Sequence, residues 1–147
     1  MQLSRKADYA VRAMLELAMR PPGATVIIRD IAERQEIPRP FLAKIIPELV
    51  AAGLLRTDRG NQGGVSLTRS PETISLLEII EAIEGPLALN RCTYEPSRCA
   101  SSSRCAVDRV WVRAQVQLNA LLRHTRLDTL AQTQRSIDQA GVTSGRR

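Results

Sequence analysis

Three cysteines give this sequence its clearest chemical signal. Cys92, Cys99 and Cys105 are the only cysteines in the chain, and they follow the spacing C-x6-C-x5-C in a stretch that is poor in apolar residues. Three thiolates from one short loop can ligate zinc or an iron–sulfur cluster, or can serve as a redox switch. An arginine directly precedes each cysteine (Arg91, Arg98 and Arg104), and a nearby cation lowers the pKa of a thiol. The segment is therefore predicted to be a metal or thiol site.

Few other donor side chains stand near these cysteines. Glu95 lies between them and Asp108 follows closely, so either carboxylate could complete a ligand set. The one histidine, His124, follows a long predicted helix and is expected to cap the end of that helix. No histidine–nucleophile pair or phosphate-binding loop is recognisable, so the sequence does not predict an enzyme.

Length and composition restrict the class of protein. The chain has 147 residues, which fits one domain with an appended element, and no apolar run approaches the roughly 18 residues needed to span a membrane. The amphipathic N-terminus carries acidic residues and does not resemble a signal peptide, so a cytoplasmic protein with reduced cysteines is expected. The net charge of +6 and the pI near 10.0 favour a polyanionic partner such as double-stranded DNA.

Hydrophobic periodicity predicts three helices in the first half of the chain, over residues 5–20, 30–35 and 39–52, with a small strand near residues 26–28. The second and third helices are separated by a tight turn at Ile37-Pro38, which is the helix-turn-helix pattern. Pro47 lies inside the third helix, the expected recognition helix, and is predicted to kink it.

Two short predicted strands, 54–57 and 65–68, are joined by a glycine-rich loop over residues 58–64. After a helix-turn-helix, such a hairpin is typical of the wing of a winged helix, although a plain hairpin in an unrelated α+β fold is the alternative. The predicted DNA contacts are basic side chains of the recognition helix and wing, with further phosphate contacts around them. They are Arg39, Lys44 and Arg59, with Ser4, Arg29 and Gln62 as the phosphate contacts.

The second half of the chain predicts a helix from Ser70 through Ile83 and a long helix over residues 106–123. Apolar residues of the long helix step by three and four, as in a coiled-coil seam, which predicts a homodimer. The fold class is mostly α with a small β wing. The expected organisation is a DNA-binding domain over 1–85, a cluster-binding loop over 86–105, a dimerisation helix and return segment over 106–135, and a flexible tail over 136–147.

Several segments together resemble one bacterial family. They are MQLSRKADYAVRAML, IRDIAERQEIP, FLAKIIPELVAAGLL, RGNQGGV and SLLEIIEAIEG, within a likeness that covers roughly residues 1–130. These segments resemble the winged-helix iron–sulfur transcription regulators of the IscR/NsrR family. The resemblance implies a homodimer that binds palindromic promoter DNA, and a cluster, 4Fe-4S rather than 2Fe-2S, held by the three cysteines and a fourth ligand that is not a cysteine.

Two positions make the chain more similar to NsrR-like members. IscR-like members carry a histidine three residues after the last cysteine, where Asp108 stands here, and NsrR-like members have an aspartate in the first helix, where Asp8 stands here. The resemblance therefore implies Asp8 of the partner subunit as the fourth ligand, with Asp108 as the fallback. Ala43 replaces the glutamate of the IscR-like recognition helix, which argues against an IscR-type operator preference.

The function expected from these observations is a transcription regulator, acting as a repressor, whose DNA affinity is set by a cluster that senses iron, nitric oxide or redox state. The alternative is a winged-helix regulator that uses zinc or thiol oxidation at the three cysteines. An electron carrier that does not bind DNA is disfavoured, because the helix-turn-helix order and Arg59 in the wing would then have no purpose.

Overall fold

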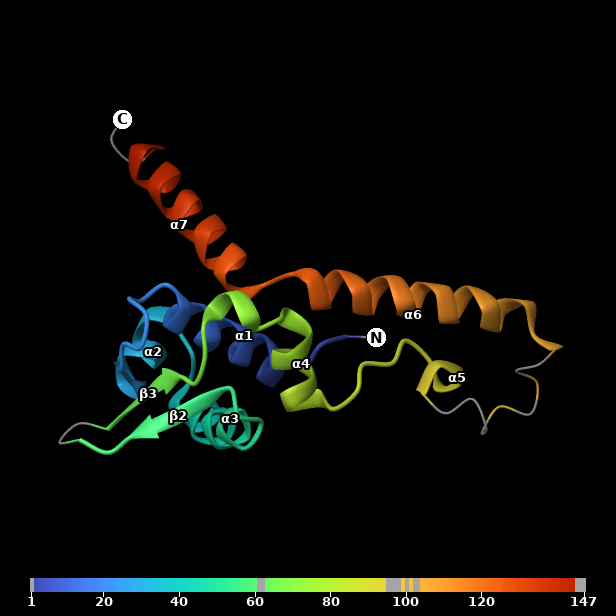
Figure 1. Ribbon diagram of the computed structural model, residues 1–147, viewed down its shortest axis with the longest axis horizontal. Helices are drawn as coiled ribbons and strands as arrows, with labels where there is room; N and C mark the ends of the chain where they lie inside the picture. Colours follow the sequence, from blue (N-terminus) through green and yellow to red (C-terminus); the bar gives the residue numbers. More distant parts are fainter. Residues whose placement is uncertain (1, 61–62, 95–98, 100, 102–103, 145–147) are drawn as a thin grey trace.

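The computed structural model describes residues 2–60, 63–94, 99, 101 and 104–144, with side chains as far as residue 141. Figure 1 shows an N-terminal body of helices and a small sheet, from which the long helix α6 (Ala106–His124) projects. The short helix α5 (Arg91–Tyr94) lies beside the half of α6 that is farther from the body, and α7 (Leu127–Ser144) begins where α6 meets the body. The predicted fold class, mostly helical with a small antiparallel sheet, is confirmed.

Helix α1 (Arg5–Ala18) is the centre of the body and contacts α2, α3, α4 and α7. Ser4 caps it, because the Ser4 hydroxyl oxygen accepts a hydrogen bond from the Ala7 amide at 3.1 Å. Ala10, Ala13 and Met14 are fully buried on its inner faces. The small alanine side chains let neighbouring helices approach closely, which is how one helix can contact several others.

The helix-turn-helix consists of α2 (Ile28–Gln35) and α3 (Arg39–Ala51). Helix α2 ends where Glu36 adopts a left-handed conformation with φ of 51°, and the next residue, Ile37, is buried in the core. Helix α3 buries one face through Leu42, Ile45 and Leu49. It continues through Pro47, which lies exposed on the opposite face, so the residue predicted to kink α3 does not end it.

The strands β1 (Val26–Ile27), β2 (Leu55–Asp58) and β3 (Gly64–Leu67) form an antiparallel sheet in the order β1-β3-β2. The hairpin of β2 and β3 is the predicted wing, within one residue of the expected bounds. Gly64 pairs with Asp58 on one side and with Ile27 on the other. A Cβ atom at Gly64 would stand 2.9 Å from the Val26 carbonyl oxygen, so the pairing of β1 with β3 requires glycine here.

The helix predicted to begin at Ser70 is two separate elements, and that prediction was wrong. A 3₁₀ turn, η1 (Pro71–Thr73), precedes α4 (Leu76–Glu84). The Ser75 hydroxyl oxygen accepts a hydrogen bond from the Glu78 amide at 3.2 Å, and the Glu78 carboxylate accepts one from the Ser75 amide at 2.8 Å. This reciprocal capping box begins α4 five residues later than the serine–proline signal suggested.

Helices α6 and α7 meet at a joint on the body, formed mainly by backbone groups. The Leu76 amide donates to the Thr125 carbonyl oxygen and the Leu127 amide donates to the Ile74 carbonyl oxygen, both at 2.9 Å. The side chain of Leu127 is fully buried. The C-terminal end of α6 is therefore fixed to the start of α4.

Helix α7 extends into the segment 136–147, which was predicted to be a flexible tail, and remains helical through Ser144. Leu127 and Ala131 are buried, and Arg135 donates a hydrogen bond to the Ala18 carbonyl oxygen at 3.3 Å. These contacts fix the first half of α7 against α1. Gly141, which costs an exposed helix only about 1 kcal/mol, does not interrupt the continuation.

Part of the predicted seam on α6 is not covered by the described residues of this chain. Val107, Val110 and Leu121 are 55%, 60% and 66% exposed, and Trp111 is 38% exposed. Ala114, Leu118 and Leu122 of the same predicted seam are half-buried. An apolar stripe of this kind on a projecting helix is typical of a surface that packs on a partner.

Candidate metal centre and nucleic-acid interface

Cys92 lies on the one-turn helix α5, which its neighbours hold in place. Asn90 precedes α5, and its side-chain oxygen accepts a hydrogen bond from the Arg91 amide at 2.7 Å. The Thr93 hydroxyl donates to the Asn90 carbonyl oxygen at 2.7 Å and accepts from the Asn90 amide at 3.2 Å. These local bonds shape the turn that presents Cys92, since four residues are too few to form a stable helix alone.

Gln115 ties the segment before α5 to the middle of α6. Its side-chain oxygen accepts a hydrogen bond from the Leu89 amide at 2.7 Å, and its amide group donates to the Asn119 side-chain oxygen at 2.9 Å. Gln115 is only 7% exposed, and it is the buried polar residue of α6. A buried glutamine whose side-chain oxygen and nitrogen are both hydrogen-bonded has a fixed side-chain position. Here it holds the segment before Cys92 against α6.

Asp108 and Cys99 lie near enough to Cys92 to affect its thiol. All three cysteines are half-buried and are not joined as disulfides. Burial raises the pKa of the Cys92 thiol, and the neighbouring Asp108 carboxylate raises it further, with a smaller contribution from Cys99. The Oδ1 atom of Asp108 is buried and has no hydrogen-bond partner among the described residues. A buried carboxylate oxygen beside thiols is a donor that a metal would satisfy.

Cys105 is the N-cap residue of α6, at the opposite end of the segment from Cys92. A cavity of about 220 Å³ borders it, lined by Arg104, Ala106 and Arg109 as well. The cysteine is therefore flanked by two arginines and by the N-terminus of a helix.

The donor set suits a thiolate-bound metal or cluster, but the described residues do not assemble a closed site. Among residues 2–60, 63–94, 99, 101 and 104–144, no three histidine, cysteine, aspartate or glutamate residues are grouped so that they could hold a metal ion. The case for a metal or cluster therefore rests on the chemistry of the donors, which are three half-buried thiols and the Asp108 oxygen that has no partner among the described residues. It does not rest on a preformed arrangement of ligands.

The remaining predicted ligands are placed as follows. Asp8 lies exposed on α1, where its carboxylate is 3.8 Å from the guanidinium of Arg12. His124 is the last residue of α6, and its Nδ1 atom lies 2.7 Å from the Ala120 carbonyl oxygen, so it caps the helix as expected. Glu95 lies outside the described residues.

The predicted DNA contacts of the recognition helix are exposed and available. Arg39 and Lys44 on α3 form no ion pair with any described residue, and the same is true of Arg59 at the end of the wing strand β2. Arg29, at the start of α2, is 3.8 Å from the carboxylates of Asp30 and Glu33. The surface formed by α3, the start of α2 and the wing therefore presents cations to a polyanion.

Two further predicted contacts need comment. Ser4 already makes two intramolecular hydrogen bonds. Its hydroxyl oxygen caps α1, and its amide donates to the Glu84 carboxylate at 3.0 Å. Gln62 lies outside the described residues. Near Arg59, hydrogen bonds from Thr25 (2.6 Å) and Ser66 (3.0 Å) lower the pKa of Asp58, which keeps this carboxylate charged at the base of the wing.

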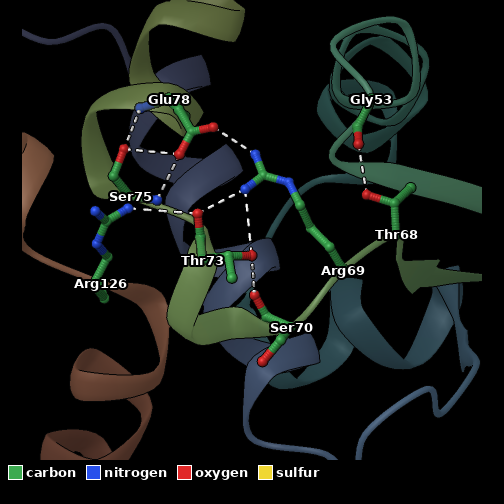
Figure 2. Close-up of polar contacts among 8 residues, drawn as sticks. All are labelled: Gly53, Thr68, Arg69, Ser70, Thr73, Ser75, Glu78 and Arg126. Carbon is green, nitrogen blue, oxygen red and sulfur yellow. Dashed lines mark hydrogen bonds and ion pairs between the residues drawn. The ribbon is translucent and has the colours of Figure 1, made fainter.

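A polar network connects the wing to the joint between α6 and α7, and sequence reasoning missed it (Figure 2). Arg69, just after β3, donates to the Thr73 carbonyl oxygen at 2.6 Å and pairs with the Glu78 carboxylate. Arg126 donates to the same Thr73 oxygen at 3.4 Å. The S-x-x-E capping signal at Ser75 could have indicated its centre. Arg69 beside the wing and Arg126 at the joint therefore share one hydrogen-bond acceptor, the Thr73 carbonyl oxygen.

The comparisons with known proteins agree with this architecture. The family model Rrf2, described as an iron-dependent transcriptional regulator, matches residues 3–133. Rv1287 of Mycobacterium tuberculosis, classed with the HTH-type transcriptional regulators, is 36% identical over 131 residues, which cover 89% of this chain and 81% of Rv1287. The HTH-type transcriptional regulator IscR of Escherichia coli is 30% identical over 141 residues, which cover 96% of this chain and 86% of IscR.

A solved structure is similar as well. CymR, described as the global cysteine regulator of B. subtilis, matches with a TM-score of 0.76 and 26% identity over 90% of this chain and 98% of CymR. None of the described helices is both long and apolar enough to cross a membrane. The winged-helix architecture, the exposed cations and these matches lead to one conclusion: the chain belongs to the Rrf2 family of transcriptional regulators.

Proposed function

We propose that the chain is a homodimeric cytoplasmic repressor that binds promoter DNA through α3 and the wing, and that an iron–sulfur cluster on Cys92, Cys99 and Cys105 sets its DNA affinity. The observation that carries the proposal is the set of three half-buried thiols between α4 and α6, with an Asp108 carboxylate oxygen near Cys92 that has no partner in the described part of the chain. When bound, a cluster would supply iron that exchanges electrons and reacts with nitric oxide or oxygen. A 4Fe-4S cluster is favoured over 2Fe-2S by the similarity to NsrR-like regulators.

A carboxylate is proposed as the fourth ligand, and two aspartates compete for this position. Asp108 is the nearer one within a chain, because it lies near Cys92 and has a buried oxygen without a partner among the described residues. Asp8 of the partner subunit is favoured by the resemblance, and the Asp8 side chain is 63% exposed on α1, where a second molecule could reach it. A carboxylate is a harder and weaker ligand than a thiolate, so this position would be the labile one.

The long helix offers a physical route from the cysteines to the DNA-reading surface. Cys105 caps one end of α6, and the other end is bonded to the start of α4 at the joint. Nineteen residues at about 1.5 Å each separate these ends by roughly 28 Å. The exposed apolar stripe of α6 is proposed to pack on the same stripe of a second copy. A change at the cysteines would then alter the spacing of the two recognition helices.

Anaerobic purification with iron and sulfide analysis tests the cluster. The protein should be brown with broad visible absorption, and the Cys92→Ser variant should lose both colour and iron. Asp8→Ala and Asp108→Ala identify the fourth ligand, because the variant at the ligand should assemble a cluster that is degraded faster. Asp128→Ala, a half-buried aspartate of α7, is the matched control. Colourless protein without iron after anaerobic purification would reject the cluster.

Gel-shift assays test the DNA-binding surface independently of the cluster. Replacing Arg39, Lys44 and Arg59 together by alanine should abolish binding, because these exposed cations lack intramolecular ion pairs in the described chain. Affinity should fall steeply with salt, since each neutralised phosphate releases counterions. Unaltered affinity in the triple variant would exclude α3 and the wing as the contact surface.

A second candidate is a winged-helix regulator that responds through zinc or thiol oxidation at the same cysteines. What supports it is the presence of three free thiols in one short segment, since thiols that approach one another can form a disulfide. CymR is itself described as a cysteine regulator. Colourless protein that contains zinc, or that gains a disulfide on oxidation with a change in DNA affinity, would select this candidate.

A further inference from the structure

An apolar groove opens on the surface that we propose to face DNA. Ile28 at the start of α2 and Ala43, Ile46 and Pro47 of α3 line it, and its volume is about 370 Å³. Two arginines, Arg29 and Arg39, line the same groove. An apolar depression of this size between two guanidinium groups is an unusual feature for a surface that meets only phosphates.

The exposed face of α3 is also unusual in its hydrogen-bonding capacity. Its exposed side chains are two cations and four small apolar groups, namely Arg39, Lys44, Pro40, Ala43, Pro47 and Ala51. The cations can only donate hydrogen bonds, and the one carboxylate of α3, Glu48, is paired with Lys6 of α1. Helix α3 therefore exposes no unpaired acceptor for the cytosine amino group and no side-chain amide for bidentate contact with adenine.

We propose that this groove is a subsite for the 5-methyl group of thymine. Two kinds of base contact remain open to α3: donation from Arg39 or Lys44 to guanine, and apolar contact with the thymine methyl group. Ala43 and Pro47 are exposed and belong to both α3 and the groove, so a methyl group in the major groove would meet carbon on both sides. The flanking Arg29 and Arg39 would meet the adjacent phosphates or guanines. The inference rests on the proposed DNA binding through α3.

The two arginines that line the groove favour DNA over other possible ligands. A hydrophobic peptide or small molecule would gain nothing from Arg29 and Arg39, whereas duplex DNA satisfies the cations and the apolar walls together. Ala43 also stands where the resemblance to IscR-like members would place a glutamate. With alanine here, the groove stays apolar and open.

Replacement of thymine by deoxyuridine tests the subsite, because it removes only the methyl group. A binding site is first selected from random duplex DNA, and each thymine is then replaced singly by deoxyuridine. Loss of one methyl contact should weaken binding about 4-fold at one thymine of each half-site, and about 15-fold when both half-sites are changed together. Replacements at the other thymines should have little effect.

A double-mutant cycle identifies the groove as the contact. In Ala43→Gly, which removes the methyl group of the groove wall, the deoxyuridine effect at the sensitive thymine should fall below 2-fold. Ala51→Gly is the matched control, because Ala51 is exposed on the same helix outside the groove and should keep the full effect.

The outcomes separate the subsite from the proposed function. Specific DNA binding that is insensitive to deoxyuridine at every thymine would overturn the subsite alone, as would a sensitivity that Ala43→Gly leaves undiminished. Failure to recover any bound DNA would overturn the proposed function and the subsite with it. Folding of each glycine variant is checked by its thermal unfolding midpoint.

Discussion

The hydrogen bond between Gln115 and Leu89 should control how firmly the cysteine segment is held on α6. Gln115→Met removes both side-chain hydrogen bonds of Gln115 while keeping a long unbranched side chain with similar helix propensity. It leaves the partly buried Leu89 amide without an acceptor, at a cost of about 1–3 kcal/mol. Few other bonds hold the segment before α5, so the cost should appear as local opening and not as global unfolding.

Hydrogen exchange measures this opening directly. A loss of about 1–3 kcal/mol should speed exchange of the Leu89 amide by roughly 5- to 150-fold, while the urea midpoint of the whole protein changes little. Cys92 should also react faster with a thiol reagent. Asn119→Ala is the control, because it removes only the second hydrogen bond and keeps the Leu89 contact. Unchanged Leu89 exchange in Gln115→Met would show that the bond does not hold the segment.

Three further predictions follow from the geometry. Gly64→Ala should destabilise the protein by about 1–3 kcal/mol in urea unfolding, because the new Cβ would meet the Val26 carbonyl oxygen, whereas Gly60→Ala should be nearly neutral, since nothing lies within 4 Å of its Cβ position. Burial alone would raise the pKa of Glu78, but hydrogen bonds from Ser75 and Arg69 outweigh it and lower this pKa. That stabilisation is present above the ordinary carboxyl pKa and is lost as pH falls through the lowered value. In the Glu78→Gln variant, the free energy of unfolding should therefore fall less between about pH 6 and pH 3 than it does in the unmodified protein. Val110→Asp should place two carboxylates in the proposed dimer seam, and sedimentation should show weaker association; an unchanged dissociation constant would remove α6 from the interface.

Most of the body could be predicted from the sequence because its signals are local. The apolar periodicity of α1 and α3, the turn at Ile37 and the glycines of the wing each act over a few residues. The capping box at Ser75 was equally local but was masked by the earlier serine–proline signal. Sequence signals therefore predicted an element correctly where they did not compete with a second signal nearby.

The missed features depend on contacts between distant segments. Helix α7 lacks a strong apolar stripe, and it persists because Leu127 and Ala131 reach the core beside α1. The contact of Asp108 with Cys92 likewise depends on how α5 packs on α6, which no spacing reveals. The same applies to Gln115, whose partner is 26 residues away along the chain.

The joint between α6 and α7 has a consequence for how the protein can diverge. Its two central hydrogen bonds join backbone groups only, at Leu76 with Thr125 and at Leu127 with Ile74. Substitution of a side chain cannot delete such bonds, with the exception of proline at a donor position. Side chains at both ends of α6 can therefore change, and the cysteine segment can be replaced by another sequence, while the backbone attachment of α6 to the N-terminal body is kept. A proline at position 76 or at position 127 would each remove one of these two bonds and should loosen the joint.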